Sequence, residues 1–137
     1  MSNDESTKPL AEYEFPARAL LESLHYCVFP EELESDPLVA FHATASDILE
    51  SIKADGFRPA SDFGGVLESV SFARKSVGAL THWMTRRDQA GDAVIIAVRF
   101  DSLDGYDYDE QDIRLYPPKK QPEIIGICRF PSDYRHV

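Results

Sequence analysis

The sequence predicts an α+β domain, in which mixed sheets of about five to six strands are flanked by helices. Three observations support this class. Short apolar runs rich in β-branched and aromatic residues recur along the chain, most clearly in its second half. Segments with apolar residues three and four positions apart lie between the earlier runs, as in amphipathic helices. The late strands follow one another through short connections, which favours a mixed sheet or two small packed sheets.

Size and charge limit the classes of function. The chain has 137 residues, 43% hydrophobic and 28% charged, which fits one globular domain with a single core. Its net charge is −10, and residues 1–36 hold nine acidic and two basic side chains against fifteen and twelve in residues 37–137. No basic surface is expected, which argues against non-specific nucleic-acid binding but not against a nucleotide ligand.

Cysteine use and the N-terminus indicate a cytoplasmic protein. Cys27 and Cys128 are far apart and form no CxxC motif, so we expect two buried thiols and neither a disulfide nor a metal site. No apolar run approaches the ~18 residues that a membrane span needs. Residues 1–9 are polar and acidic, unlike a signal peptide, and we expect them to be disordered.

Residues 10–137 are expected to form a single domain, with an N-terminal helix and acidic connector over 10–37 and a core over 38–130. The helix follows Pro16, a residue tolerated at the first helical position. Its apolar side chains are Ala17, Leu20, Leu21, Leu24 and Val28. Pro30 ends this helix, and residues 31–37 then form a solvated surface stretch.

Two strand-and-helix units open the core. Residues 38–42 form a short strand, and Thr44 is expected to cap the helix that follows it. Gly56 is expected just beyond the end of that helix. A loop over residues 58–69 leads to a second strand over 70–73.

The rest of the core is a helix and three strands. Residues 75–87 have apolar side chains at helical spacing, and Gly91 follows as a stop. Residues 93–100 are apolar on both faces, so this strand is expected at the centre of the sheet. Strands over 113–116 and 123–130 complete the series.

Three places are candidates for chemistry. His42 ends a strand just before a helix, an edge where α/β folds bind ligands, although local backbone groups could equally satisfy it, with Thr44 as a plain cap. The pair Gly64-Gly65 permits close approach of a ligand, or simply makes a turn. Glu123 opens an apolar strand and is either functional or an exposed edge residue.

Other motifs are absent. The acidic run from 101 to 112 includes Asp107, Asp109 and Asp112, but its spacing does not match an EF-hand, so we expect a solvated loop. The glycines match neither a Walker loop nor a Rossmann fingerprint. GxSxG and HExxH are also missing.

The order of these features resembles the ADP-ribosyltransferase superfamily, the NAD-using fold of the diphtheria-toxin and poly(ADP-ribose) polymerase type. Its histidine-bearing branch has a His on the first strand, often followed by x-Thr, an aromatic residue on a second strand and a Glu on a later one. His42 and Thr44 match the first position, Phe72 lies at the second and Glu123 matches the third. The resemblance covers about residues 38–130.

The chain departs from this pattern in two ways. The family's second-strand Tyr is missing, and Ser71 or Phe72 stands in its place. Gln121-x-Glu123 is similar to the Gln-x-Glu pair of the toxin branch, although the first strand follows the histidine branch.

The resemblance implies catalytic roles for Glu123, which would stabilise the cation that develops as the nicotinamide–ribose bond breaks, and for Gln121, which would orient an acceptor group. In the NAD site, Phe72 would face the nicotinamide and the Ser71 hydroxyl would support Glu123. Arg74 would meet the pyrophosphate. The residues implied to hold NAD are His42, Thr44, Gly65, Ser71, Phe72 and Arg74.

The implied function is transfer of ADP-ribose from NAD to a macromolecule, with protein favoured over nucleic acid as the acceptor, or simple hydrolysis of NAD. NAD would be the substrate, with no metal and no membrane involved. A toxin, a phage factor and a housekeeping modifier would share these features. The alternative is a non-catalytic module of the same fold that binds a protein partner through its acidic N-terminal region. Nucleic-acid mimicry is a weaker third hypothesis, because the acidity is concentrated at one end.

Overall fold

The computed structural model describes residues 10–59, 64, 68–85, 92–116 and 119–131. In chain order the elements are β1 (Glu12–Tyr13), α2 (Arg18–Ser23), α3 (Glu31–Glu34), β2 (Val39–Ala45), the short 3-10 helix η1 (Ser46–Ile48), α4 (Leu49–Asp55), β3 (Val70–Ala73), α5 (Ser76–Met84), β4 (Ala93–Arg99), β5 (Asp107–Tyr108), β6 (Asp112–Leu115) and β7 (Glu123–Phe130). The class is α+β, as predicted.

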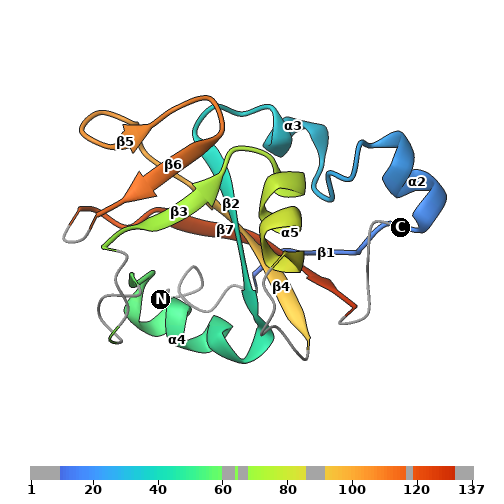
Figure 1. Ribbon diagram of the computed structural model, residues 1–137, viewed down its shortest axis with the longest axis horizontal. Coiled ribbons are helices and arrows are strands. Elements are labelled where there is room, and N and C mark those ends of the chain that lie inside the picture. The colour runs from blue at the N-terminus through green and yellow to red at the C-terminus, as the bar shows by residue number, and fades with distance from the viewer. Residues whose placement is uncertain (1–9, 60–63, 65–67, 86–91, 117–118, 132–137) are drawn as a thin grey trace, which may run out of the picture.

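All the strands belong to one mixed sheet with the order β1-β7-β4-β2-β3-β6-β5. Among the strands that the structure describes, only β1 and β7 pair in parallel. β4 lies between β2 and β7 in the sheet, and Figure 1 shows β3, β6 and β5 running in a different direction from β2. Accordingly, β2 pairs with β4 along its whole length but with β3 at Phe41 and Ala73 alone. The sheet therefore divides at the line between β2 and β3, which we call the β2–β3 seam.

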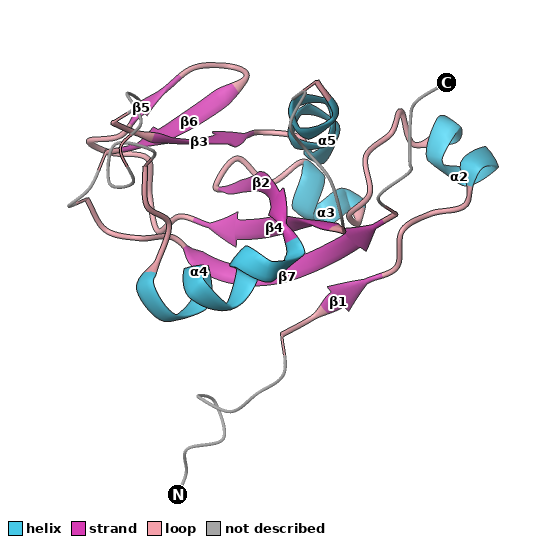
Figure 2. Ribbon diagram, turned by 60° about the horizontal axis from the view of Figure 1, so that its bottom comes forward, coloured by secondary structure: helices cyan, strands magenta, loops and turns pink. Residues whose placement is uncertain are grey.

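Each face of the sheet has its own apolar core. On one face Phe41 and Ile95 pack with Leu80 of α5 and with Phe29 from the N-terminal segment, and we call this the α5 face. On the other face, the α4 face, the side chains of β4, β3 and β6 pack with α4 and Phe57. Figure 2 shows α4 and α5 on opposite sides of β2 and β4. Strand alternation therefore decides which core each side chain joins.

The sheet has seven strands, more than the five to six expected. The additional strands are β1 and β5, each of two residues. Segments this short carry no measurable periodicity, so local sequence does not reveal them.

The expected cap at Thr44 is wrong. Thr44 lies inside β2 and pairs with Val94, and the strand continues to Ala45. The residue before η1 is Ala45, whose side chain makes no capping hydrogen bond. The prediction for Gly56 is confirmed: it ends α4 with φ +82°, in the left-handed region that favours glycine.

The N-terminal helix is shorter than predicted. It ends at Ser23 and not near Pro30, because His25 and Tyr26 have left-handed backbone angles, with φ 56° and 67°. The acidic connector also differs, since it contains helix α3, in which Glu34 is buried.

Several predictions fall on residues that the structure does not describe. They are the tail over 1–9, Gly65, residues 86–87 and Gly91. Within the described segments, no helix is both long enough and apolar enough to cross a membrane.

Candidate functional site

His42 lies at the β2–β3 seam. Its Nδ1 is 3.0 Å from the backbone oxygen of Ser71, on the far side of the line where the two strands separate. Because a carbonyl oxygen only accepts hydrogen bonds, Nδ1 carries the proton of this contact. In the neutral ring Nε2 then carries the lone pair, so the sheet selects one tautomer of His42.

Two phenyl rings border the imidazole on the α4 face. The centroid of Phe57 is 5.5 Å from that of His42, and the centroid of Phe72 is 5.6 Å away. Phe57 and Phe72 also contact each other edge to face at 4.9 Å. His42 is therefore part of a three-ring cluster at the seam.

Phe72 is fully buried in the core, at 0% exposure. Its ring packs against Phe100 as well as Phe57 and His42. In this arrangement the ring has no exposed face for a nicotinamide, so its evident role is packing. Thr44 is half-buried on the same face of β2 as His42.

Glu123 does not come together with His42. It pairs with Arg99, which pairs with Val39 on the α5 face, whereas His42 pairs with Ile96 on the α4 face. Three residues along the strand and two strands across it correspond to about 14 Å between Cα positions. The Glu123 side chain is exposed at this distance, on the other face of the sheet.

The role implied for the Ser71 hydroxyl is not formed either. Ser71 is on β3 and Glu123 on β7, with β2 and β4 between them in the sheet. Ser71 is instead exposed beside Arg114, its partner on β6. At the seam, Ser71 contacts His42 through its backbone oxygen and not through its hydroxyl.

Arg74 and Gln121 both bind backbone groups. Arg74 Nη1 donates to the carbonyl of Asp109 at 3.0 Å and Nη2 to that of Pro37 at 3.3 Å. The Gln121 amide pairs with the backbone N–H and C=O of Phe57. Both side chains thus hold chain segments in place, whatever further contacts they make.

An acid that sequence reasoning set aside lies closer to the seam. Asp112 on β6 pairs with Ala73, which pairs with Phe41 next to His42. Asp112 shares its face of the β3–β6 pair with Ser71 and Arg114. Among the described residues, none donates a hydrogen bond to its carboxylate. From the sequence, Asp112 was one acid of an acidic run. Its place next to β3 could not be predicted, because the pairing of β3 with β6 is a long-range contact.

Two other acids of this hairpin, Asp107 and Asp109, form ion pairs with Arg114. Its guanidinium contacts Asp109 at 2.8 Å and Asp107 at 3.4 Å. The hydrogen bond from Arg114, together with backbone N–H donors from Gln111 and Asp112, lowers the pKa of Asp109 to about 2. Asp109 thus has a structural role in the β5–β6 turn.

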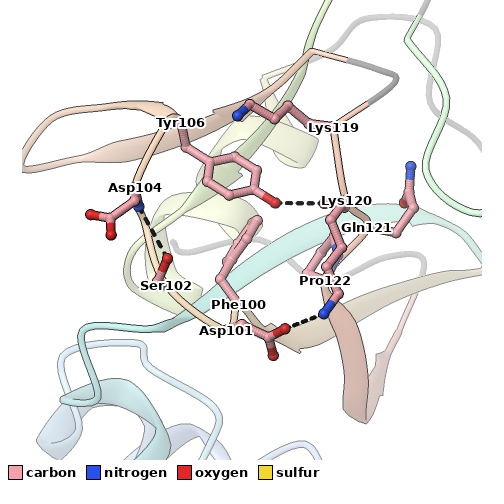
Figure 3. A pocket seen from close by; sticks show the side chains of 9 residues that line it. All are labelled: Phe100, Asp101, Ser102, Asp104, Tyr106, Lys119, Lys120, Gln121 and Pro122. Carbon is pink, nitrogen blue, oxygen red and sulfur yellow. Dashed lines mark hydrogen bonds and ion pairs between the residues drawn. The ribbon is translucent and has the colours of Figure 1, made fainter.

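A hollow of about 400 Å³ lies at the far end of β4. Figure 3 shows Phe100 beneath Tyr106, with the Lys120–Asp101 ion pair at one side. The Tyr106 hydroxyl donates to the Lys120 carbonyl at 2.6 Å, and Lys119 lies over the Tyr106 ring. Of the predicted site residues that the structure describes, only Gln121 lines this hollow.

A second hollow of about 410 Å³ lies near the other end of the sheet, between Glu14, Ser46, Asp92 and Arg129. The Ser46 hydroxyl is buried there and has no hydrogen-bond partner among the residues that the structure describes. None of the predicted site residues in the described segments lines this second hollow, and neither hollow is lined by His42, Phe57 or Phe72.

Comparison with known proteins adds no relative. No protein-family model matches the chain, and neither the curated proteins nor the solved structures yielded a match.

Proposed function

We propose that the protein transfers ADP-ribose from NAD to a macromolecular acceptor and releases nicotinamide. One observation carries the proposal: the His42 imidazole contacts the backbone of Ser71, so that the first two signature segments of the resemblance lie side by side. The resemblance implies that such a histidine binds the dinucleotide.

We assign the carboxylate role in this proposal to Asp112 and not to Glu123. The later strand next to β3 is β6, and Asp112 is placed two strands from Phe41, about 10 Å by Cα spacing. Its carboxylate accepts no hydrogen bond within the described part of the chain, although its charge lies close enough to the Arg114 guanidinium to raise the pKa of that group. Through Ala73 and Phe41, Asp112 belongs to the α5 face, as Glu123 does, whereas His42 lies on the α4 face. A dinucleotide that met both His42 and Asp112 would therefore cross the β2–β3 seam, where the two strands separate.

The chemistry needs one fixed negative charge. As the bond between the nicotinamide nitrogen and the ribose carbon breaks, the bonding pair leaves with nicotinamide and positive charge develops on the ribose. A carboxylate beside that ribose stabilises the charge. A nucleophile of the acceptor then forms the new bond and loses its proton to solvent. Water in place of the acceptor gives hydrolysis.

The test is nicotinamide release from NAD, with and without cell extract, in wild type and variants. Asp112→Asn is expected to reduce the rate by about 10²-fold or more, because the transition-state charge loses its partner. Glu123→Gln is the matched control, because Glu123 is an exposed acid on the same α5 face as Asp112. It should keep the wild-type rate. His42→Ala should weaken NAD binding by about tenfold, the effect of one lost hydrogen bond.

The outcomes separate the variants of the proposal. Release that requires extract indicates transfer, and labelled NAD then identifies the acceptor, for which the acidic chain favours a protein over a nucleic acid. Release without extract indicates hydrolysis. Loss of rate in Glu123→Gln with Asp112→Asn unaffected would return the role to Glu123.

A second candidate is a non-catalytic module that binds a protein partner. It is favoured by the burial of Phe72 and by the separation of Glu123 from His42. If NAD neither binds nor releases nicotinamide with wild-type protein, this candidate gains. The next measurement would then be capture of partners by the wild-type chain and by a chain in which the exposed acids Glu31 and Glu32 are replaced by Gln.

A further inference from the structure

The Gln121 side chain pairs with the Phe57 backbone as another strand would. The Phe57 N–H donates to Gln121 Oε1 at 2.8 Å, and Gln121 Nε2 donates to the Phe57 carbonyl at 3.1 Å. The two residues are 64 positions apart in the chain. Phe57 lies just beyond α4 and outside every strand, so its backbone has no neighbouring strand to pair with. The Gln121 side-chain amide supplies the hydrogen-bond partners that a neighbouring strand would otherwise provide.

Gly56 makes room for this contact. A Cβ atom there would lie 2.9 Å from Gln121 Cδ, closer than van der Waals contact allows. Its φ of +82° also favours glycine, so geometry and space agree at this position. The Gln121 side chain is therefore seated against the chain turn that ends α4.

The two hydrogen bonds between Gln121 and the Phe57 backbone, which we call the clamp, lie next to the ring cluster at the seam. Phe57 is 2% exposed, and its ring lies edge to face against both His42 and Phe72. Phe72 is held by β3, but Phe57 belongs to no strand or helix. Figure 3 shows the Gln121 amide directed away from Tyr106 and from the Lys120–Asp101 pair, at the edge of the hollow. What fixes the Phe57 backbone thus determines where its ring meets His42.

We infer that Gln121 is a positioning residue: its two hydrogen bonds to the Phe57 backbone hold the Phe57 ring against His42 and keep the imidazole on the Ser71 carbonyl. The inference deepens the proposed function, because it states what prepares His42 for a ligand. In this proposal Gln121 acts on the site through Phe57 and does not orient an acceptor group.

The test is made without NAD. Nitrogen-15 NMR of the imidazole, above its titration midpoint, reports which ring nitrogen carries the proton. In wild type we expect His42 to be protonated at Nδ1, as the Ser71 contact requires. In Gln121→Met, which keeps the size and loses the hydrogen bonds, we expect the signals to move toward the mixed tautomers of a histidine in water. Lys120→Ala, in the same loop, is the control and should leave His42 unchanged.

A variant on the opposite side of the clamp gives independent evidence. Gly56→Ala crowds Gln121 and also strains the turn before Phe57, so it should shift the His42 signals in the same direction. A folded Gln121→Met protein with wild-type His42 signals would overturn the inference. The unmodified protein provides a further check. Its Phe57 amide should exchange with solvent at least about tenfold more slowly than an open amide. Exchange at the open rate would show that the clamp is not formed.

Failure of the inference is distinguishable from failure of the proposed function. Gln121-dependent His42 signals in a protein that does not bind NAD support the positioning role and count against NAD chemistry. NAD binding with His42 signals that do not depend on Gln121 supports the chemistry and overturns the positioning role. If Gln121 does position His42 for NAD, Gln121→Met should weaken NAD binding by a factor similar to His42→Ala.

Discussion

The backbone N–H of Ser76 donates to the carboxylate of Glu34 at 3.0 Å, and the Ser76 hydroxyl donates to the same carboxylate. Glu34 also accepts the backbone N–H of Phe29 at 3.2 Å. The Ser76 hydroxyl in turn accepts the N–H of Val28 at 2.9 Å. These contacts join the N-terminal segment to the first turn of α5, where the helix dipole favours a negative charge.

Glu34→Ala is expected to destabilise the protein by about 2–4 kcal/mol, because it leaves buried N–H donors without an acceptor at a helix N-terminus. The midpoint of urea unfolding measures the effect. Glu32→Ala removes an exposed acid of the same helix and should change stability by less than about 0.5 kcal/mol. Equal midpoints for both variants would show that the buried contacts contribute nothing.

Asp109 should make stability fall at acid pH. Its pKa is about 2 in the folded protein, below its ordinary value of 3.8, chiefly because of the Arg114 hydrogen bond. A lowered pKa contributes stability above the unfolded value, and this is lost as pH falls from about 4 through about 2. We expect thermal melts of Asp109→Asn to depend less on pH in this window than those of wild type. Asp104→Asn, in the preceding exposed loop, should keep the wild-type slope.

The two thiols should resist alkylation while the protein is folded. Burial raises the pKa of Cys128 to about 12, and burial with the nearby Glu34 charge raises that of Cys27. Because only the thiolate reacts, iodoacetamide at neutral pH should label both slowly, and Cys128 more slowly than the less buried Cys27. Mass spectrometry of the labelled peptides measures the two rates. Rates in the native state equal to those in urea would contradict this prediction.

Phe72→Ala is expected to cost about 3–5 kcal/mol, as for other buried phenylalanines. Phe72→Leu retains most of the volume and should cost less, about 1–2 kcal/mol. Chemical denaturation distinguishes these values. A Phe72→Ala protein of wild-type stability that no longer bound NAD would instead indicate a ring exposed to the ligand.

Much of the local structure was predictable because it follows from side-chain pattern. The apolar runs of β4 and β7 predicted both strands within about one residue. The helical spacing of α5 predicted that helix, apart from its ends. Missed features are those with no local pattern: the two-residue strands, α3, and the early end of α2 at left-handed residues.

The sequence alone determined which residues were available, namely a histidine at a strand, an aromatic residue on a second strand and several acids on later segments. Tertiary structure alone decided which of them meet. Strand order places β6 beside β3 and leaves Glu123 beyond β4, while alternation sends Glu123 and His42 to opposite faces. Gln121 lies two residues before Glu123 in the chain, and its side chain hydrogen-bonds to the Phe57 backbone. Backbone pairing between segments far apart in the chain sets these distances, and local side-chain pattern does not specify the pairing.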